Sequence, residues 1–426
     1  MPQEAWSIHA IRERMVAAGY QVVQINSAVG DEKTTRADLI AWANDGEGSL
    51  VPWAAVEIKR DPKARQALAL QSLIRVRDLT GTVEHYAVLD GQWFKADRGL
   101  RILEPIDGPT PPEHGVRAFL RDRELATSLV LDRLAYDERA DGRAGGNHML
   151  PVTDVFANTA MPGIEVPETG FVHVEPDVLW QSRRDALVRW AARVSKDSPI
   201  TSEPVIARAV AVLGAKRLGR VVLDPFCGTG SFLWEALDRA LLNDGHTRFI
   251  GLELDNRLAE LAVQIGHAAL LPVHIEQCDS FDHPIPDADL IVSAPPIGVR
   301  LPQPRTLANG ELTNDVATAA VDLCVQALRR GGRAVLHLPA NFTYITSCES
   351  YRQFLASNYR VAAVIGLPRG AMISTGIRSI LLVIDNTDPG ETFVAQLGED
   401  WIAQLGSEGA ALRAAVSHID GSTEKV

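Results

Sequence analysis

The sequence predicts an α/β protein with two units, a smaller α/β unit first and a larger unit with a doubly wound parallel sheet after it. Strands and helices alternate from about residue 177 to residue 400, the order that builds parallel βαβ units. Within that stretch, an apolar strand at 221–224 runs directly into a glycine-rich turn and a helix. Between residues 20 and 89, short apolar segments flank a single helix, which indicates a separate sheet.

Size and composition are those of an ordinary globular chain. The length of 426 residues allows two or three domains, and a hydrophobic content of 46% is enough for sizeable cores. No apolar run reaches the length of a membrane span, and no signal peptide is visible, so we expect a cytoplasmic protein without membrane contact. The four cysteines lack the spacing of a disulfide framework or a zinc site, which favours reduced thiols.

The formal net charge of −12 argues against a protein that holds DNA unaided, because such proteins usually carry a basic face. DNA binding would require local arginine clusters or a basic partner chain, although short arginine clusters are more often solvated helix faces. The candidate clusters are Arg183, Arg184, Arg189 and Arg193, and Arg329, Arg330 and Arg333.

The N-terminal unit has a predicted order of helix, three strands, helix and strand. A proline-rich break at 108–112, a helix at about 114–136 and a loose connection follow it. The predicted elements span residues 4–18, 20–25, 37–42, 53–59, 61–79 and 85–89. The predicted domains are 1–105, a linker with a helix at 106–176, the larger unit at 177–400 and a C-terminal tail at 401–426.

Two carboxylates and a lysine give the N-terminal unit a candidate site. Glu57 and Lys59 lie two residues apart on one strand, so their side chains share a face, and Asp38 lies on the preceding strand. Converging acids can hold Mg²⁺ with part of its water shell, and a lysine beside the ion can orient or deprotonate an attacking water. Such a site would cleave a phosphodiester.

Residues 20–95 resemble the N-terminal region of type I restriction endonuclease subunits, members of the PD-(D/E)xK nuclease superfamily. The resemblance rests on segments 28–31, 36–39 and 56–59 and on a helix containing Gln71. It implies a restriction-endonuclease-like fold with Asp38, Glu57 and Lys59 as the nuclease residues. The family often has an aromatic residue one turn after its glutamine, whereas this chain has Arg75. A degraded nuclease fold kept for docking or DNA contact is the alternative.

The glycine-rich turn of the larger unit predicts a ligand site. Gly228 and Gly230 allow positive-φ turns and close approach of a ligand, and Asp224 ends the strand at the edge where parallel sheets bind ligands. No lysine follows the glycines, so a phosphate loop is disfavoured. An acidic strand end suits a polar or cationic ligand such as the amino-acid part of S-adenosylmethionine.

The next two strands also end in acids. Glu253 comes about twenty residues after the turn, where doubly wound folds grip ribose hydroxyls. A further strand reaches Asp279, Ser280 and Phe281, which offer a carboxylate for an adenine amino group and an aromatic ring to stack on the base. Solvated strand-end acids are the alternative for each residue alone, but three consecutive acidic strand ends make it improbable.

From about 177 to 395 the chain resembles the N6-adenine DNA methyltransferases of type I restriction-modification systems, their modification subunits. Matching segments are 198–204, 224–233, 251–255, 330–336, 361–368, 375–376 and 379–383. The resemblance implies a Rossmann-like class I S-adenosylmethionine-dependent methyltransferase fold. The residues it places around the cofactor are Thr201, Asp224, Phe226, Gly228, Gly230, Glu253, Asp279 and Ser280.

The chain departs from this family where the reaction would occur. The family has Asn-Pro-Pro followed by Phe or Tyr, whose asparagine steers the adenine amino group and whose aromatic ring stacks on the flipped base. This chain has Ala294-Pro295-Pro296-Ile297, which supplies neither group. We therefore expect impaired methyl transfer, and Ser293 faces the wrong side of its strand to substitute.

Three functions remain open. The first is an adenine-class DNA methyltransferase fused to a nuclease-like domain, working in restriction or phage defence. The second is a pseudo-methyltransferase that senses S-adenosylmethionine or DNA, with or without a Mg²⁺-dependent nuclease. The third, least favoured, is a methyltransferase for a protein or small molecule. Only a short loop lies between 298 and 314, so sequence specificity would come from a separate specificity subunit, within a homo- or hetero-oligomer.

Overall fold

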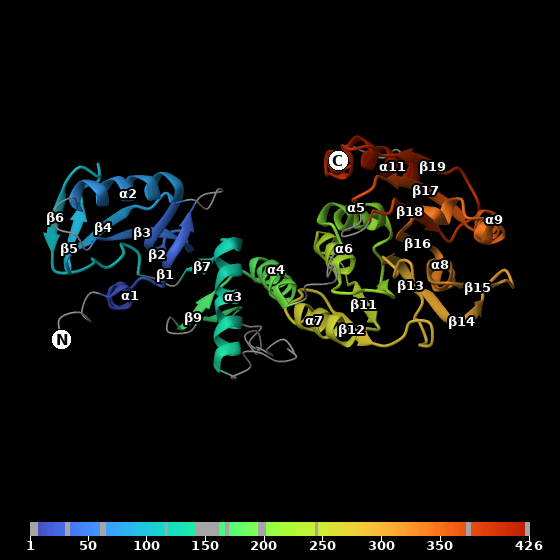
Figure 1. Cartoon of the computed structure of the whole chain (residues 1–426), viewed down its shortest axis with the longest axis horizontal. Helices are drawn as coiled ribbons and strands as arrows, with labels where there is room; N and C mark the ends of the chain where they lie inside the picture. The colour runs from blue at the N-terminus through green and yellow to red at the C-terminus, as the bar shows by residue number, and fades with distance from the viewer. Residues whose placement is uncertain are drawn as a thin grey trace. The chain divides into compact units, whose positions relative to one another are not determined.

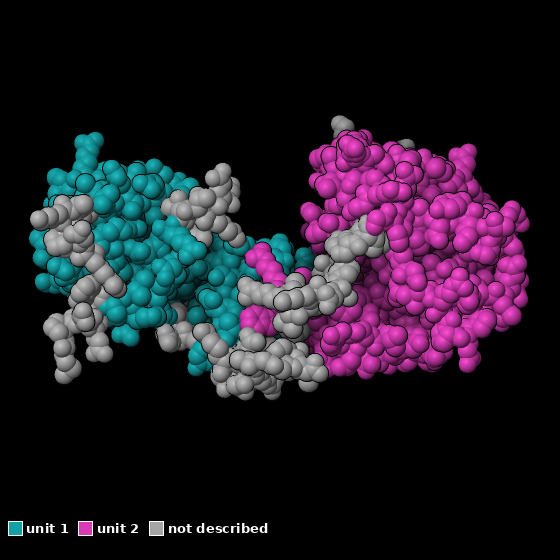
Figure 2. Space-filling view, in the orientation of Figure 1, with its two compact units in different colours: residues 1–147, 151–186 teal, residues 148–150, 187–426 magenta. Residues whose placement is uncertain are grey.

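A computed structural model of the chain divides it into two compact units (Figures 1 and 2). Unit 1 holds residues 1–147 and 151–186, and unit 2 holds 148–150 and 187–426. The structure describes residues 7–29, 35–59, 65–115, 118–140, 162–166, 170–194, 202–242, 246–371 and 376–421. In this described part, no helix has both the length and the apolar character needed to cross a bilayer.

Unit 1 is built on a mixed sheet with strand order β1-β2-β3-β4-β5-β6, and a short strand, β7, beside β3. Strands β3 and β4 run parallel and are joined by helix α2, whereas the other consecutive pairs are antiparallel. The predicted order of elements up to β4 is confirmed. The elements are α1 (Ile8–Ala17), β1 (Val22–Val29), β2 (Thr35–Asn44), β3 (Ser49–Lys59), α2 (Arg65–Thr80), β4 (Glu84–Leu89), β5 (Gln92–Ala96), β6 (Leu103–Ile106) and β7 (Phe119–Leu120).

The two helices cover opposite faces of this sheet. Ile11 and Met15 of α1 pack in one buried cluster with Val56 of β3, whereas Ala69 of α2 packs with Ala87 of β4 in another. Because side chains alternate along a strand, the residues of β3 on either side of Val56 point toward the α2 face. Glu57 is one of them.

The segment predicted as a linker belongs mostly to unit 1. Strand β7 extends the sheet by pairing with β3, and Leu120 forms a bridge to Val174. The predicted helix is α3 (Arg123–Ala140), followed by the hairpin β8 (Gly163–Val166) and β9 (Gly170–His173). Helix α4 (Pro176–Val194) contains the division between the units, ten residues beyond the predicted boundary at 177. Its first half is tied to unit 1 because Arg123 donates to Gln181 and Asp185.

Unit 2 contains a sheet with strand order β12-β11-β10-β13-β16-β18-β17-β19 (Figure 1). All pairs are parallel except those of β18, which runs antiparallel to both of its neighbours. The chain builds outward from β10 to β12 and then crosses to β13 on the other side of β10. This reversal of strand order creates a topological switch point, where open α/β sheets bind ligands.

The elements of unit 2 agree with the predicted alternation of strands and helices. They are α5 (Pro204–Gly214), β10 (Val221–Asp224), α6 (Ser231–Leu241), β11 (Arg248–Glu253), α7 (Asn256–Gly266), β12 (Val273–Gln277), β13 (Ala288–Ser293), β14 (Arg300–Thr306), β15 (Leu312–Asp315), α8 (Val316–Gln326), β16 (Leu328–Pro339), α9 (Glu349–Asn358), β17 (Arg360–Leu367), β18 (Ser379–Asp385), β19 (Phe393–Gln396), α10 (Trp401–Leu405) and α11 (Ala410–Asp420).

Two parts of unit 2 differ from the sequence predictions. The segment predicted as a short loop after Gly298 forms an antiparallel hairpin, β14 and β15. The predicted C-terminal tail holds α10 and α11, which bury Trp401 and Leu412. Helix α11 is fastened by a hydrogen bond from Lys216 Nζ to the carbonyl oxygen of Asp420, at 2.6 Å. These helices are only 5 and 11 residues long, and short elements give a weak periodic signal.

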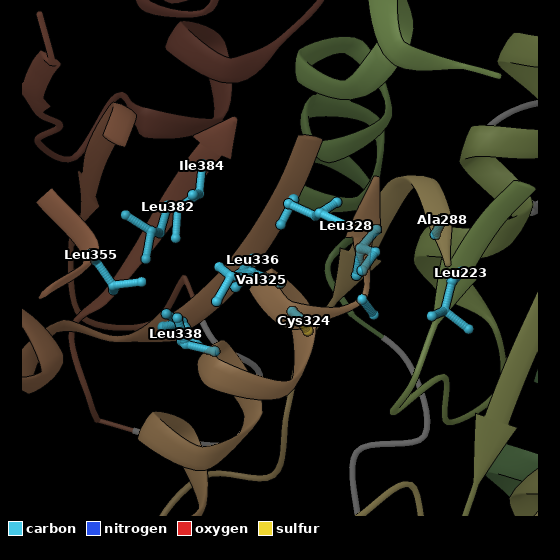
Figure 3. Packing of buried hydrophobic residues seen from close by; sticks show 14 of the residues in the cluster. Leu223, Ala288, Cys324, Val325, Leu328, Leu336, Leu338, Leu355, Leu382 and Ile384 are labelled. Carbon is cyan, nitrogen blue, oxygen red and sulfur yellow. The ribbon is translucent and has the colours of Figure 1, made fainter. Parts of the chain in front are cut away.

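Apolar side chains fill the space between the sheet and helices α8 and α9 (Figure 3). Leu336 and Leu338 of β16 pack in one cluster with Val325 of α8 and Leu355 of α9. Helix α5 lies on the other face, where a Cβ on Gly214 would come within 2.8 Å of the Leu290 side chain. Burial of each large apolar side chain contributes roughly 1.5–3 kcal/mol, so this core holds the sheet flat enough to align its strand ends.

Each candidate arginine cluster contains a buried member that cannot contribute to a surface patch. Arg183 is 2% exposed, and Arg333 is fully buried. Arg333 Nε and Nη2 donate to the two carboxylate oxygens of Asp385 at 2.6 and 3.0 Å, and Nη1 donates to the Leu213 carbonyl at 2.8 Å. The arginine thus joins β16 to β18 and to α5.

Removing one partner of this pair should strongly destabilise unit 2. Asp385→Asn removes the bidentate counter-charge and leaves the buried guanidinium with only the Asp420 carboxylate, 2.9 Å from Nη1, and we expect a loss of about 3–5 kcal/mol in the free energy of unfolding. Asp388→Asn breaks the exposed pair that Arg330 forms at 2.9 Å and should cost about 1 kcal/mol or less. Calorimetric melting of both variants checks the difference, and equal losses would contradict the assignment.

Candidate functional site

The turn after β10 depends on two glycines with positive φ. Gly228 has φ 55° and Gly230, the N-cap of α6, has φ 86°, so the predicted turn is confirmed. A Cβ on Gly230 would lie 2.4 Å from the Trp234 ring, which excludes a larger residue there. A Cβ on Gly228 would meet no atom within 4 Å, so the backbone at this position faces open space. A ligand can therefore approach the turn closely.

Asp224 ends β10 and is 2% exposed. Its Oδ1 accepts hydrogen bonds from the Ser293 hydroxyl at 2.7 Å and from the Phe226 N–H at 3.1 Å. Burial raises the pKa of the carboxyl group to about 7, and Glu253 raises it further, against the lowering effect of these hydrogen bonds. A cation bound beside the Asp224 carboxyl group would therefore favour its ionised form.

Glu253 ends β11 and reaches back to the glycine turn. Its Oε2 accepts the Gly228 N–H at 2.7 Å, and its Oε1 accepts the Asp255 N–H at 2.8 Å. Each carboxylate oxygen has a second lone pair, so both oxygens can still accept from ribose hydroxyls. The structure thus brings together Glu253 and Gly228, which lie 25 residues apart in the sequence.

Asp279, Ser280 and Phe281 form the turn after β12. Asp279 Oδ1 accepts the Phe281 N–H at 2.9 Å, and the Ser280 hydroxyl donates to the Pro225 carbonyl. Phe281 lies 5.3 Å from Phe226, centroid to centroid, at an interplanar angle of 52°. The turns after β10 and β12 are therefore joined by a hydrogen bond and by an aromatic pair. Two rings and a carboxylate at one place suit a flat, amino-bearing base.

The reaction-site segment lies at the end of β13. Ala294 and Ile297 are half-buried, Pro295 is buried and Pro296 is exposed. Ser293 is buried and its hydroxyl donates to Asp224, and its inability to replace the missing acceptor stays a prediction. Thr201, also predicted to bind cofactor, lies outside the described residues.

The residues predicted for the nuclease site converge at the end of β3. Lys59 Nζ lies against Glu57 Oε2 and 3.8 Å from Asp38 Oδ2. Asp38 Oδ2 also accepts the Ile58 N–H at 2.7 Å, which fixes it across the β2–β3 pair. Burial raises the pKa of Glu57 to about 7, and the Asp38 charge raises it further, although Lys59 opposes this. Gly30 and Asp31 of the resemblance lie outside the described residues.

Two contacts near the cleft were not predicted. The Ser293–Asp224 hydrogen bond depends on adjacent strands that are 69 residues apart in sequence. Arg305 of β14 places its guanidinium carbon 5.2 Å from the centre of the Phe281 ring and contacts Asp282 at 3.2 Å. The proline-rich composition of the hairpin concealed its strands, because proline is depleted in strands.

The larger unit matches the model of a known family. Residues 191–400 match the model of the N-6 DNA Methylase family. A tRNA (guanine(10)-N2)-dimethyltransferase from Methanothermobacter thermautotrophicus is 27% identical over 143 residues, 33% of this chain and 39% of that protein. The aligned region thus spans well under two thirds of this relative.

Solved structures show likenesses at low identity. The methyltransferase subunit of a type I restriction-modification system from Streptococcus thermophilus has a TM-score of 0.48 and 16% identity, covering 59% of this chain and 58% of that one. The type IIG restriction endonuclease BpuSI has a TM-score of 0.41 and 15% identity, covering 98% of this chain and 60% of that one. The sheet that carries Asp224, Glu253 and Asp279 lies wholly within the segment that matches the N-6 DNA Methylase family.

Proposed function

We propose that unit 2 binds S-adenosylmethionine and is a DNA methyltransferase-like module of the N6-adenine class, working in a restriction-modification or phage-defence system. One observation carries the proposal. The acidic ends of β10, β11 and β12 meet at one edge of the sheet, where the Gly228 N–H is tied to Glu253 at 2.7 Å. The family match over residues 191–400 supports the reaction class.

The donors and acceptors of this edge fit that cofactor. Glu253 has free lone pairs for the ribose hydroxyls, and Asp279 with the Phe226–Phe281 pair suits adenine. Asp224 and the open backbone at Gly228 suit the cationic amino-acid part. Ser280 holds the adenine-side turn in place through the Pro225 carbonyl. S-adenosylmethionine would supply an electrophilic methyl group, and these residues would only bind and orient it.

Methyl transfer to adenine should be impaired. Ala294 has no acceptor for the adenine amino group, and Ile297 has no aromatic face. Loss of stacking costs roughly 1–3 kcal/mol per base, and loss of a polar contact made in the transition state costs on the order of a hundredfold in rate. Cofactor binding depends on other residues and should survive. A cofactor or DNA sensor in the cytoplasm, with a specificity subunit supplying DNA contacts, is therefore the alternative form of this proposal.

Cofactor affinity should rise with pH through the ionisation of Asp224. The unliganded carboxyl has a pKa of about 7, and a cationic ligand binds better to its ionised form. We expect about tenfold tighter binding of S-adenosylmethionine at pH 7 than at pH 5.5, where the amino group of the ligand stays charged. Calorimetric titration of the wild type and of Asp224→Asn measures this.

Asp224→Asn should bind more weakly and lose most of the pH dependence, and Asp388→Asn is the matched control. The same raised pKa makes the ligand-free protein lose stability as pH rises from about 4 to about 7, because the folded state holds the proton more tightly. A pH-independent affinity of the wild type would contradict the role of Asp224.

Restoring the missing groups should raise methyl transfer. We expect Ala294→Asn with Ile297→Phe to transfer labelled methyl groups to mixed-sequence and single-stranded DNA at least about a hundredfold faster than the wild type. Single-stranded DNA removes the cost of base flipping. Radiolabel incorporation is the measurement, and Ile297→Leu is the control. Robust transfer by the wild type would refute the proposed impairment.

Unit 1 supports a second candidate function, a Mg²⁺-dependent DNA nuclease. The convergence of Asp38, Glu57 and Lys59 favours it, because two hard carboxylate oxygens suit Mg²⁺. Burial, and to a smaller extent the Asp38 charge, raises the pKa of Glu57, and a bound cation would offset both by favouring the ionised carboxylate. In this proposal the two acids hold the ion, and Lys59 orients the attacking water and offsets phosphate charge. The alternative is a nuclease fold retained for docking.

Nicking of supercoiled DNA separates these two alternatives. If unit 1 is a catalyst, Asp38→Asn, Glu57→Gln and Lys59→Ala should each reduce Mg²⁺-dependent nicking by roughly a hundredfold or more. Activity should increase as pH rises through about 7, since Mg²⁺ binds the ionised Glu57. Glu47→Gln, on the exposed β2–β3 turn, should leave nicking unchanged. Equal activity in all four variants would indicate a contaminant, and none in the wild type would favour the docking role.

A further inference from the structure

A cluster of metal-binding side chains lies beside the cofactor cleft, at the edge strand β12. Glu276, Cys278 and His283 each offer one ligand atom, and these atoms all lie within 4.8 Å of one another. All three residues are half-buried, and β12 has a neighbour on only one side. The cluster therefore lies at an accessible edge of the sheet.

The local backbone explains why these residues meet. Glu276 and Cys278 are two residues apart at the end of an extended strand, so their side chains emerge on the same face. The chain then turns back, because the Asp282 and His283 N–H groups both donate to the Asp279 carbonyl at 3.0 Å. His283 Nε2 thereby comes 3.6 Å from Glu276 Oε2.

His274, on the same strand face, lies outside this group of three and would become a fourth ligand only after a side-chain rotation. His274 Nε2 lies 3.7 Å from Glu276 Oε2, on the side facing solvent. Ligand atoms around a tetrahedral zinc ion are roughly 3.3–3.7 Å apart, as follows from bond lengths of roughly 2.0–2.3 Å. The His283–Glu276 distance of 3.6 Å falls within that range, and the His274–Glu276 distance of 3.7 Å lies at its upper limit.

We propose that Glu276, Cys278 and His283, with His274 as the fourth ligand, form a binding site for a borderline-soft divalent cation such as Zn²⁺. A thiolate, imidazoles and one carboxylate match the ligand preferences of zinc, whereas Mg²⁺ and Ca²⁺ prefer oxygen ligands only. The cysteine spacing alone gave no such indication, because only one cysteine takes part.

The site would fix the turn on which the cofactor cleft depends. Cys278 and His283 bracket Asp279, Ser280 and Phe281, so a cation bound to both ends would restrain these residues. This consequence, unlike the site itself, rests on the proposed binding of S-adenosylmethionine. Binding of one ligand to a site already ordered by another is tighter because less conformational entropy is lost.

Cobalt titration of the chelator-treated full chain tests the site without any cofactor. We expect one thiolate-bound Co²⁺ per chain, counted from its visible bands of tetrahedral coordination and its near-ultraviolet thiolate-to-cobalt band, so that an ion held by the oxygen ligands of Asp38 and Glu57 is not counted. Cys278→Ser should abolish the thiolate band, and His283→Ala should weaken binding by roughly 10–100-fold or more. His267→Ala changes an exposed histidine outside the cluster and should match the wild type. Melting curves of the variants report whether each remains folded.

Three results would overturn the site: cobalt lost on desalting, a thiolate band that persists in Cys278→Ser, or equal affinities of His283→Ala and His267→Ala. Titration of S-adenosylmethionine with and without Zn²⁺ then tests the coupling, expected to be roughly fivefold or more. Unchanged affinity would overturn the coupling and leave the site standing. Absence of cofactor binding in both conditions would refute the proposed function, while the cobalt spectra still decide the metal site.

Discussion

The hydrogen bond from the Ser293 hydroxyl to Asp224 joins the two strands on either side of the reversal in strand order. It is buried, 2.7 Å long, and links residues 69 apart in the sequence. Because β10 and β13 are neighbours only in the folded sheet, the bond can form only when the crossover has been completed. The arrangement of the candidate site depends on this alignment, since β10 carries Asp224 and leads to the glycine turn, and β13 leads to Ala294.

The Ser293–Asp224 hydrogen bond lies between two groups of residues that differ in chemical character. On the β10–β12 side, acids, glycines and aromatic rings contact one another and fit a nucleoside. On the β13 side, Ala294 and Ile297 after Ser293 offer neither a side-chain acceptor nor an aromatic ring. The Ser293 hydroxyl donates to Asp224 and does not face an incoming base. The proposal therefore treats binding of a cofactor and transfer of its methyl group as separate properties.

Most of the fold was predictable, because it follows from local patterns. The alternation of strands and helices can be predicted from short segments of sequence. The same holds for the turn at Gly228 and Gly230 and for the common face of Glu57 and Lys59. Some of what sequence reasoning missed depends on contacts between distant segments. Arg333 looked like part of a basic surface cluster, yet its pairing with Asp385 across β16 and β18 buries it. The cluster of Glu276, Cys278 and His283 was missed for a different reason, since a local backbone turn creates it and the residue spacing matches no familiar metal-binding motif.

The charge distribution at the cleft constrains how DNA could reach it. In the proposed role, Asp224, Glu253 and Asp279 would attract a cationic cofactor, whereas ionised carboxylates repel phosphates within about a Debye length of roughly 8–10 Å. The formal net charge of −12 supplies no compensating field, and Arg333 is removed from the surface. Arg305, which lies against the Phe281 ring, is itself paired with Asp282. These charges favour the proposal that a separate polypeptide supplies the positive charge for contact with DNA.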